Sequence, residues 1–343
     1  MLFVLVAVVR PIAARAQDAA PAVAPISRDE LTRRLTIYLD SLSAIDQFSG
    51  LVVIASTSGG APVFQRAYGM ADRATHRDNN TETAFNLGSI NKVFTATAIR
   101  QLAAAGKVDL DSSLARYLPD YPNKEVARRI TIRQLLQMRS GIGGDIFGMP
   151  ASGNSHDIRQ NSDYLPLFAH EPLLFEPGTQ NRYSNAGFVV LGLVIERVSG
   201  ESYYDYVKRH IYEPAGMTRT AHYPADSLPA NTAIGYTRGS GPQAAPNAPP
   251  QPNTTMLPGR GSAAGGGYST AQDLLRFLAA IRADRIPGAP PAGLGVAGGA
   301  PGLNAVMEGA LPGGYDLIVL ANLDPPAAER VARMVRTWLG ARD

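Results

Sequence analysis

Residues 85–92 read FNLGSINK, and this stretch contains the sharpest local signal in the 343-residue sequence. The apolar pattern that follows predicts a helix over residues 90–105, so Ser89 would stand at its amino-terminal end. Free backbone N–H groups and the helix dipole favour negative charge at such a position. Lys92 comes three residues later, which places both side chains on one helical face. The stretch therefore predicts a hydroxyl beside a lysine at a point where an anion would be stabilised.

A serine hydroxyl becomes a nucleophile when a base lies beside it, and a lysine with a lowered pKa can be that base. The S-x-x-K spacing alone is not specific, because a chain of this length contains about one by chance. A helix-capping serine followed by a solvated lysine gives the same letters. Ser89 and Lys92 are thus candidates that need support from elsewhere in the chain.

A second segment, Tyr183-Ser184-Asn185, stands at the start of a predicted apolar helix over residues 185–198. A tyrosine hydroxyl can relay a proton to a leaving group, and an amide can orient a lysine and a substrate. The Y-x-N spacing also occurs at residues 121–123, where neighbouring prolines favour a turn. The segment at 183–185 is therefore the better candidate of the two.

A third segment, residues 298–302, reads GGAPG and precedes a predicted strand over residues 303–309. Its glycines, Gly298 and Gly299, would let a substrate approach the backbone closely. An ordinary loop rich in glycine and proline would have the same composition, so this segment carries no weight alone.

Taken in order, these segments resemble the serine β-lactamase and penicillin-binding-protein superfamily, which has an S-x-x-K motif. Residues 130–141 (ITIRQLLQMRSG) are similar to a helix and S-G-x turn of that superfamily, and residues 177–185 to the second motif of its class C branch. The similarity covers about residues 27–340. It points to the group that includes class C β-lactamases, DD-peptidases and family VIII carboxylesterases.

The resemblance implies a serine hydrolase acting on esters or amides, β-lactams and D-Ala peptides included. Ser89 would form an acyl-enzyme, Lys92 and Tyr183 would share proton transfer, and Asn185 would position Lys92 and the substrate. The Ser89 N–H and a backbone N–H near Gly299 would form an oxyanion hole. Gly298 and Gly299 would contact the substrate. No cofactor or metal is implied.

The sequence departs from the family at its third motif, usually Lys or His, then any residue, then Gly. Here the matching residues are Val296-Ala297-Gly298, so the basic residue is missing. Residues 282–295 also look short for a stretch where the family usually has another strand. Ester hydrolysis needs no carboxylate contact and stays open. The alternative is a catalytically impaired homologue that binds cell-wall peptide or a similar ligand.

The order of predicted elements indicates an α+β fold. A helix over 27–43 and strands over 51–55 and 62–68 come first, helices dominate residues 88–220, and a hairpin and a helix end the chain. The two terminal hairpins can share one antiparallel sheet flanked by helices, beside a mainly helical middle lobe. We expect one domain over 17–343, with its α/β part at about 27–85 and 268–343 and its helical lobe at about 86–240.

Finer predictions concern the boundaries of elements and loops. Residues 239–267 and 286–302 are rich in glycine, proline and alanine and are expected to be loops. Ser269 is expected to cap a helix over 271–281, and Thr131 with Gln134 to form a capping box. Gly200 is expected to end the helix that follows Asn185.

The amino-terminal residues 1–16 resemble a secretory signal peptide, because apolar residues 2–9 are followed by Ala14-Arg15-Ala16. We expect a periplasmic or secreted protein, or one held at the membrane by this segment if it stays uncleaved. Without Arg10 and Arg15 the balance is 30 basic to 29 acidic residues, and no dense basic cluster indicates a nucleic-acid partner. The expected partner is a small-molecule or peptide substrate, and the oligomeric state stays open.

Other hydrolase classes lack their signals. The chain has no cysteine, which excludes cysteine catalysis and disulfides. It has no G-x-S-x-G element, and none of its five histidines forms an H-x-x-x-H pair. A Ser-His-Asp enzyme of the α/β-hydrolase type is therefore not supported.

Overall fold

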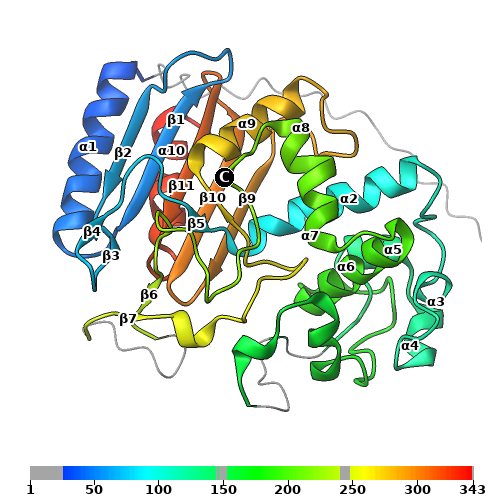
Figure 1. The fold of residues 1–343 in the computed structure, drawn as a ribbon. Helices are drawn as coiled ribbons and strands as arrows, with labels where there is room; N and C mark the ends of the chain where they lie inside the picture. Colours follow the sequence, from blue (N-terminus) through cyan, green and yellow to red (C-terminus); the bar gives the residue numbers. More distant parts are fainter. Residues whose placement is uncertain (1–25, 144–145, 147–152, 240–247, 342–343) are drawn as a thin grey trace, which may run out of the picture.

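A computed structural model describes residues 26–143, 146, 153–239 and 248–341. Within them an antiparallel sheet has the strand order β2-β1-β11-β10-β9 (Figure 1). Its strands are β1 (Gly50–Ser56), β2 (Phe64–Tyr68), β9 (Gly295–Ala300), β10 (Leu303–Leu311) and β11 (Tyr315–Ala321). The pairing of β1 with β11 runs from Gly50 opposite Ala321 to Ser56 opposite Tyr315. The α+β fold and the sheet shared by the two terminal hairpins are thus confirmed.

Helices cover both faces of this sheet, which explains why its central strands are continuously apolar. On one face lie α1 (Arg28–Ala44) and α10 (Ala327–Leu339), and on the other lies α9 (Ala271–Arg282) (Figure 1). Side chains of β1 alternate between the two cores. Leu51 and Val53 belong to the α9 side, and Val52 and Ile54 to the α1 and α10 side.

The remaining helices gather beside the sheet, where α2 packs against α6 (Figure 1). They are α2 (Lys92–Ala104), α3 (Leu114–Tyr117), α4 (Lys124–Arg129), α5 (Ile132–Leu136), α6 (Asn185–Ser199), α7 (Tyr203–Val207) and α8 (Glu213–Ala215). The predicted capping box of Thr131 and Gln134 is present at α5, and Gly200 ends α6 in the left-handed conformation. None of the helices in the described ranges is both long and apolar enough to cross a bilayer.

Short strand pairs join these parts. They are β3 (Met70–Asp72) with β4 (Arg77–Asp78), β5 (Phe85–Asn86) with β8 (Tyr268–Ser269), and β6 (Tyr236–Thr237) with β7 (Gln251–Pro252). The β5–β8 pair matters most for the site, because it ties the residues just before Ser89 to the segment that enters α9.

The cap of α9 was predicted one residue too early. Thr270 is the N-cap, and its hydroxyl accepts a hydrogen bond from the Asp273 N–H at 3.2 Å. Ser269 is still in β8, where its hydroxyl bonds Thr220 Oγ1 at 2.7 Å. Both residue types can cap a helix, and the strand pairing with β5 decides which one is free to do so.

The prediction of a loop over 286–302 was wrong for residues 295–300. These residues form β9, which pairs with β10 from Gly295 opposite Glu308 to Ala300 opposite Leu303. Backbone pairing with a neighbouring strand outweighs the low strand propensity of glycine. Residues 283–294 contain no strand, so β9 is the outer strand of the sheet. The predicted signal peptide, residues 1–16, lies outside the described residues, and the location of the protein stays a prediction.

The capping box of α5 allows a test of this local structure. Gln134 N–H donates to the Thr131 hydroxyl at 3.2 Å, and Thr131 N–H donates to Gln134 Oε1 at 2.9 Å. We expect Thr131→Ala to lower the free energy of unfolding, measured by urea denaturation, by about 1 kcal/mol. Thr131→Ser keeps a capping hydroxyl and should retain most of the parent's free energy of unfolding. Equal stabilities for the alanine variant and the parent would contradict the capping role.

Candidate active site

Ser89 lies in a 3₁₀ turn, Gly88–Asn91, that connects β5 to α2. The helix itself begins at Lys92, slightly later than predicted. Gly88 has a φ of 50°, a conformation that other residues adopt at a cost, and its N–H donates to Asn86 Oδ1 at 2.9 Å. The tight turn therefore sets Ser89 at the edge of the sheet, directly before the first turn of α2.

Lys92 is nearly buried, and its ammonium has three oxygen partners. Nζ donates to Ser89 Oγ at 3.1 Å, to Asn185 Oδ1 at 2.7 Å and to the Ala264 carbonyl at 2.5 Å. None of these partners carries a formal charge. Burial therefore lowers the pKa of Lys92 to about 7, because desolvation penalises the charged form and no anion offsets it.

Tyr183 also contacts Ser89, and its ring lies beside Lys92. Its hydroxyl shares a hydrogen bond with Ser89 Oγ, and its ring centroid lies 4.8 Å from Lys92 Nζ. Burial raises the pKa of Tyr183, and the Ser89 hydrogen bond acts against that rise. The phenol is therefore protonated near neutral pH and can donate its proton. Ser89 Oγ is thus within hydrogen-bonding reach of both groups, the convergence that the sequence motifs led us to expect.

Asn185 is held in place by the start of α6. Ser184 is the N-cap of this helix, and its hydroxyl accepts the Gly187 N–H at 3.0 Å. The backbone before it is fixed to the segment after α5, since Arg182 N–H donates to the Met138 carbonyl at 2.9 Å. In this Y-S-N sequence, Tyr183 contacts Ser89 and Asn185 contacts Lys92. Ser184, between them, caps the helix.

The Ala264 carbonyl is a partner of Lys92 that sequence reasoning missed. Its loop is fixed to α2 by Thr95, whose hydroxyl donates to the Ala263 carbonyl at 2.6 Å, and by Asn91, whose Oδ1 accepts the Gly267 N–H at 2.8 Å. A backbone oxygen carries no signal in the residue type. The sequence analysis predicted only a loop over residues 239–267, which include Ala264.

Strand β9 forms the remaining side of the site. A Cβ on Gly298 would overlap the Leu87 carbonyl oxygen and stand 2.8 Å from Ser89 N. This glycine therefore packs directly on the turn Gly88–Asn91 that contains the candidate nucleophile, called the nucleophile turn below. Gly299 lines a cavity together with Ser89. Val296 pairs with Met307 and packs against the core.

Comparisons with known proteins agree with this geometry. The Beta-lactamase family model matches residues 39–320, and the chain therefore belongs to the beta-lactamase family. Its relatives include the putative penicillin-binding protein PbpX of Bacillus subtilis (strain 168), 33% identical over 249 residues, which are 73% of this chain and 58% of that protein. Esterase EstB of Burkholderia gladioli is 29% identical over 337 residues, 90% of this chain and 84% of that protein.

The fold comparison gives the same result. The crystal structure of a penicillin binding protein from Bacillus halodurans has a TM-score of 0.75 at 28% identity, and the match covers 87% of this chain and 99% of that one. The chain spans about half the length of the curated penicillin-binding proteins that it matches. The resemblance to this family that was read from the motifs is confirmed.

The contact between β9 and the nucleophile turn can be tested with two glycines of one strand. We expect Gly298→Ala to slow labelling of Ser89 by a fluorophosphonate roughly 100-fold, because β9 must move away from the turn by an appreciable part of an ångström. Gly295→Ala is the control, since its nearest neighbour, Glu308 Cγ, would be 3.9 Å from the new Cβ. Equal labelling rates for the two variants would show that the contact does not position Ser89.

Proposed function

We propose that this protein is a serine hydrolase that cleaves esters through an acyl-enzyme on Ser89, with amides as a slower class. The observation that carries the proposal is the position of Ser89 Oγ, which is hydrogen-bonded by both Lys92 Nζ and Tyr183 Oη. A nucleophile needs a base, and its leaving group needs an acid. One buried amine and one protonated phenol supply both.

The pKa directions assign the two roles. Lys92, with a pKa of about 7, is neutral in a large fraction of molecules at slightly alkaline pH and accepts the Ser89 proton as Oγ attacks the carbonyl carbon. Tyr183 stays protonated and donates to the departing alkoxide, and Lys92 returns a proton to Tyr183. Water then attacks the acyl carbon by the same route in reverse, which releases the acid and restores Ser89.

The oxyanion formed in each step needs donors that are already in place. The Ser89 N–H is one candidate, and the Gly299 N–H is the other. A Cβ on Gly88 would lie 3.1 Å from Gly299 N, so this amide is next to the nucleophile turn. In an edge strand every second residue turns its N–H away from its neighbour, and β9 is such a strand.

An ester substrate without a carboxylate near the scissile bond agrees best with the altered third motif. Val296 cannot form the ion pair that a basic residue would offer to a substrate carboxylate. This chain covers 84% of the length of EstB and 58% of the length of PbpX, and EstB is named an esterase. We therefore rank neutral esters above β-lactams and D-Ala peptides.

A second candidate function is ligand binding by an impaired enzyme, and Val296 is the observation that favours it. In that case cell-wall peptide or a similar ligand would occupy the site without turnover. The complete set of contacts around Ser89 favours the active enzyme.

Intact-mass analysis separates these two functions. We expect one fluorophosphonate adduct per chain and turnover of p-nitrophenyl butyrate, both lost in Ser89→Ala. A serine far from the site, exposed in α1, is the control: Ser41→Ala should leave the adduct in place. A folded protein that gives neither adduct nor turnover would support the impaired homologue.

The pH dependence tests the role of Lys92. Because the neutral amine is the active form, kcat/KM should be constant above about pH 8 and fall about tenfold per pH unit below 7. The measurement is kcat/KM for p-nitrophenyl butyrate from about pH 5 to about pH 11, corrected with Ser89→Ala. A profile that is flat from pH 5 to 8, or one that rises only near pH 10, would assign the base to another group.

A further inference from the structure

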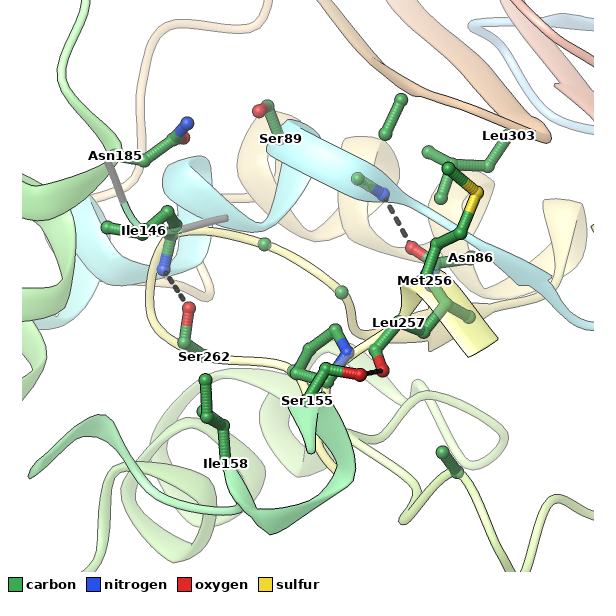
Figure 2. A pocket seen from close by; sticks show the side chains of 18 of the residues that line it. Asn86, Ser89, Ile146, Ser155, Ile158, Asn185, Met256, Leu257, Ser262 and Leu303 are labelled. Atoms are coloured by element: carbon green, nitrogen blue, oxygen red, sulfur yellow. Dashed lines mark hydrogen bonds between the residues drawn. The ribbon is translucent and has the colours of Figure 1, made fainter. Parts of the chain in front are cut away.

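The cavity beside Ser89 has a far wall made by two segments that are distant in sequence (Figure 2). One contributes Ser155 and Ile158, and the other is residues 256–258. In Figure 2, Ile158 and Leu257 lie across the cavity from Ser89. Ile146 and Tyr164 add apolar surface to the same lining.

Backbone and side-chain hydrogen bonds lock the two segments of this wall together. Ser155 Oγ donates to the Leu257 carbonyl at 3.1 Å. Gly259 N–H donates to the Ser155 carbonyl at 3.2 Å, and Arg260 N–H to the Ile158 carbonyl at 3.0 Å. The wall is therefore formed before any ligand arrives, which reduces the entropy lost on binding.

The lining holds no acidic or basic side chain among the residues that the structure describes. Three of its polar side chains already accept hydrogen bonds within the protein. Asn86 Oδ1 accepts the Gly88 N–H, Ser262 Oγ accepts the Ala264 N–H at 3.2 Å, and Asn185 Oδ1 accepts from Lys92. A charged group placed here would lose its hydration and would find no charged partner among the described lining residues.

The position of Tyr183 indicates which part of a substrate enters the cavity. Tyr183 contacts Ser89 but is not among the cavity's lining residues, and in the proposed reaction it hands its proton to the leaving group. The leaving group therefore lies on the Tyr183 side, and the acyl group extends the other way. We propose that this cavity is the acyl pocket and that it selects an uncharged, apolar acyl group. The inference rests on the proposed function.

The test varies the acyl group and keeps one leaving group. We expect kcat/KM to rise roughly tenfold from p-nitrophenyl acetate to p-nitrophenyl butyrate as two methylene groups are buried. Between p-nitrophenyl hexanoate and mono-p-nitrophenyl adipate, which have the same chain length, the neutral ester should be preferred about 100-fold. Rates for Ser89→Ala supply the blank for spontaneous hydrolysis.

A charge placed in the wall should shift this preference. Met256 lines the cavity and is 52% exposed, so Met256→Lys can be accommodated. We expect it to reduce the preference for hexanoate over adipate about fivefold. Met70→Lys is the matched control, because Met70 lies in β3, is also exposed and is not part of the cavity lining. It should leave the preference unchanged.

The outcomes separate this inference from the proposed function. If Ser89 is labelled but rates do not depend on acyl length, or adipate equals hexanoate, the acyl pocket is overturned and the hydrolase stands. A gain confined to longer alcohol groups, measured with ethyl to hexyl acetates, would assign the cavity to the leaving group and overturn the inference too. If Ser89 is not labelled, both fail.

Discussion

The burial of one amine is the constraint on which the site depends. Lys92 Nζ sits among Ser89, Asn185 and the Ala264 carbonyl, and no carboxylate is within this group of partners. Burial without a counterion destabilises the ammonium form, so the surroundings lower the pKa of Lys92 to about 7 and much of the amine is neutral near that pH. Each partner comes from a different segment, and the fold must bring all of them to one point.

The sheet supplies the rigid side of that arrangement. Packing of Gly298 against the nucleophile turn joins the outer strand to Ser89, and β5 pairs with β8 just before the turn. The helices supply the other side, because α6 starts at Asn185 and packs against α2. The site thus lies where the sheet meets the helices. Gly298 allows the backbone of β9 to approach the backbone around Ser89 closely.

Sequence patterns predicted what depends on local chemistry. Features that involve only neighbours in sequence could be predicted. They are the capping box at Thr131, the end of α6 at Gly200 and the proximity of Ser89 and Lys92. Strand β9 was missed, since its glycines have low strand propensity and only pairing with β10 makes it a strand. The Ala264 carbonyl was missed because a backbone atom leaves no mark on residue type. The cavity wall was not predicted because it joins two segments, Ser155 with Ile158 and residues 256–258, that are distant in sequence.

The pairing of β1 with β11 affects how the chain can fold during synthesis. These two central strands stand next to each other, yet one lies near residue 50 and the other near residue 320. While the ribosome is still making the middle of the protein, β1 has no neighbour on that side, and α9, which packs against one of its apolar faces, does not yet exist. The nascent chain therefore carries β1 with one edge unpaired and one apolar face uncovered for most of its translation, and the sheet can be completed only after β11 has been made.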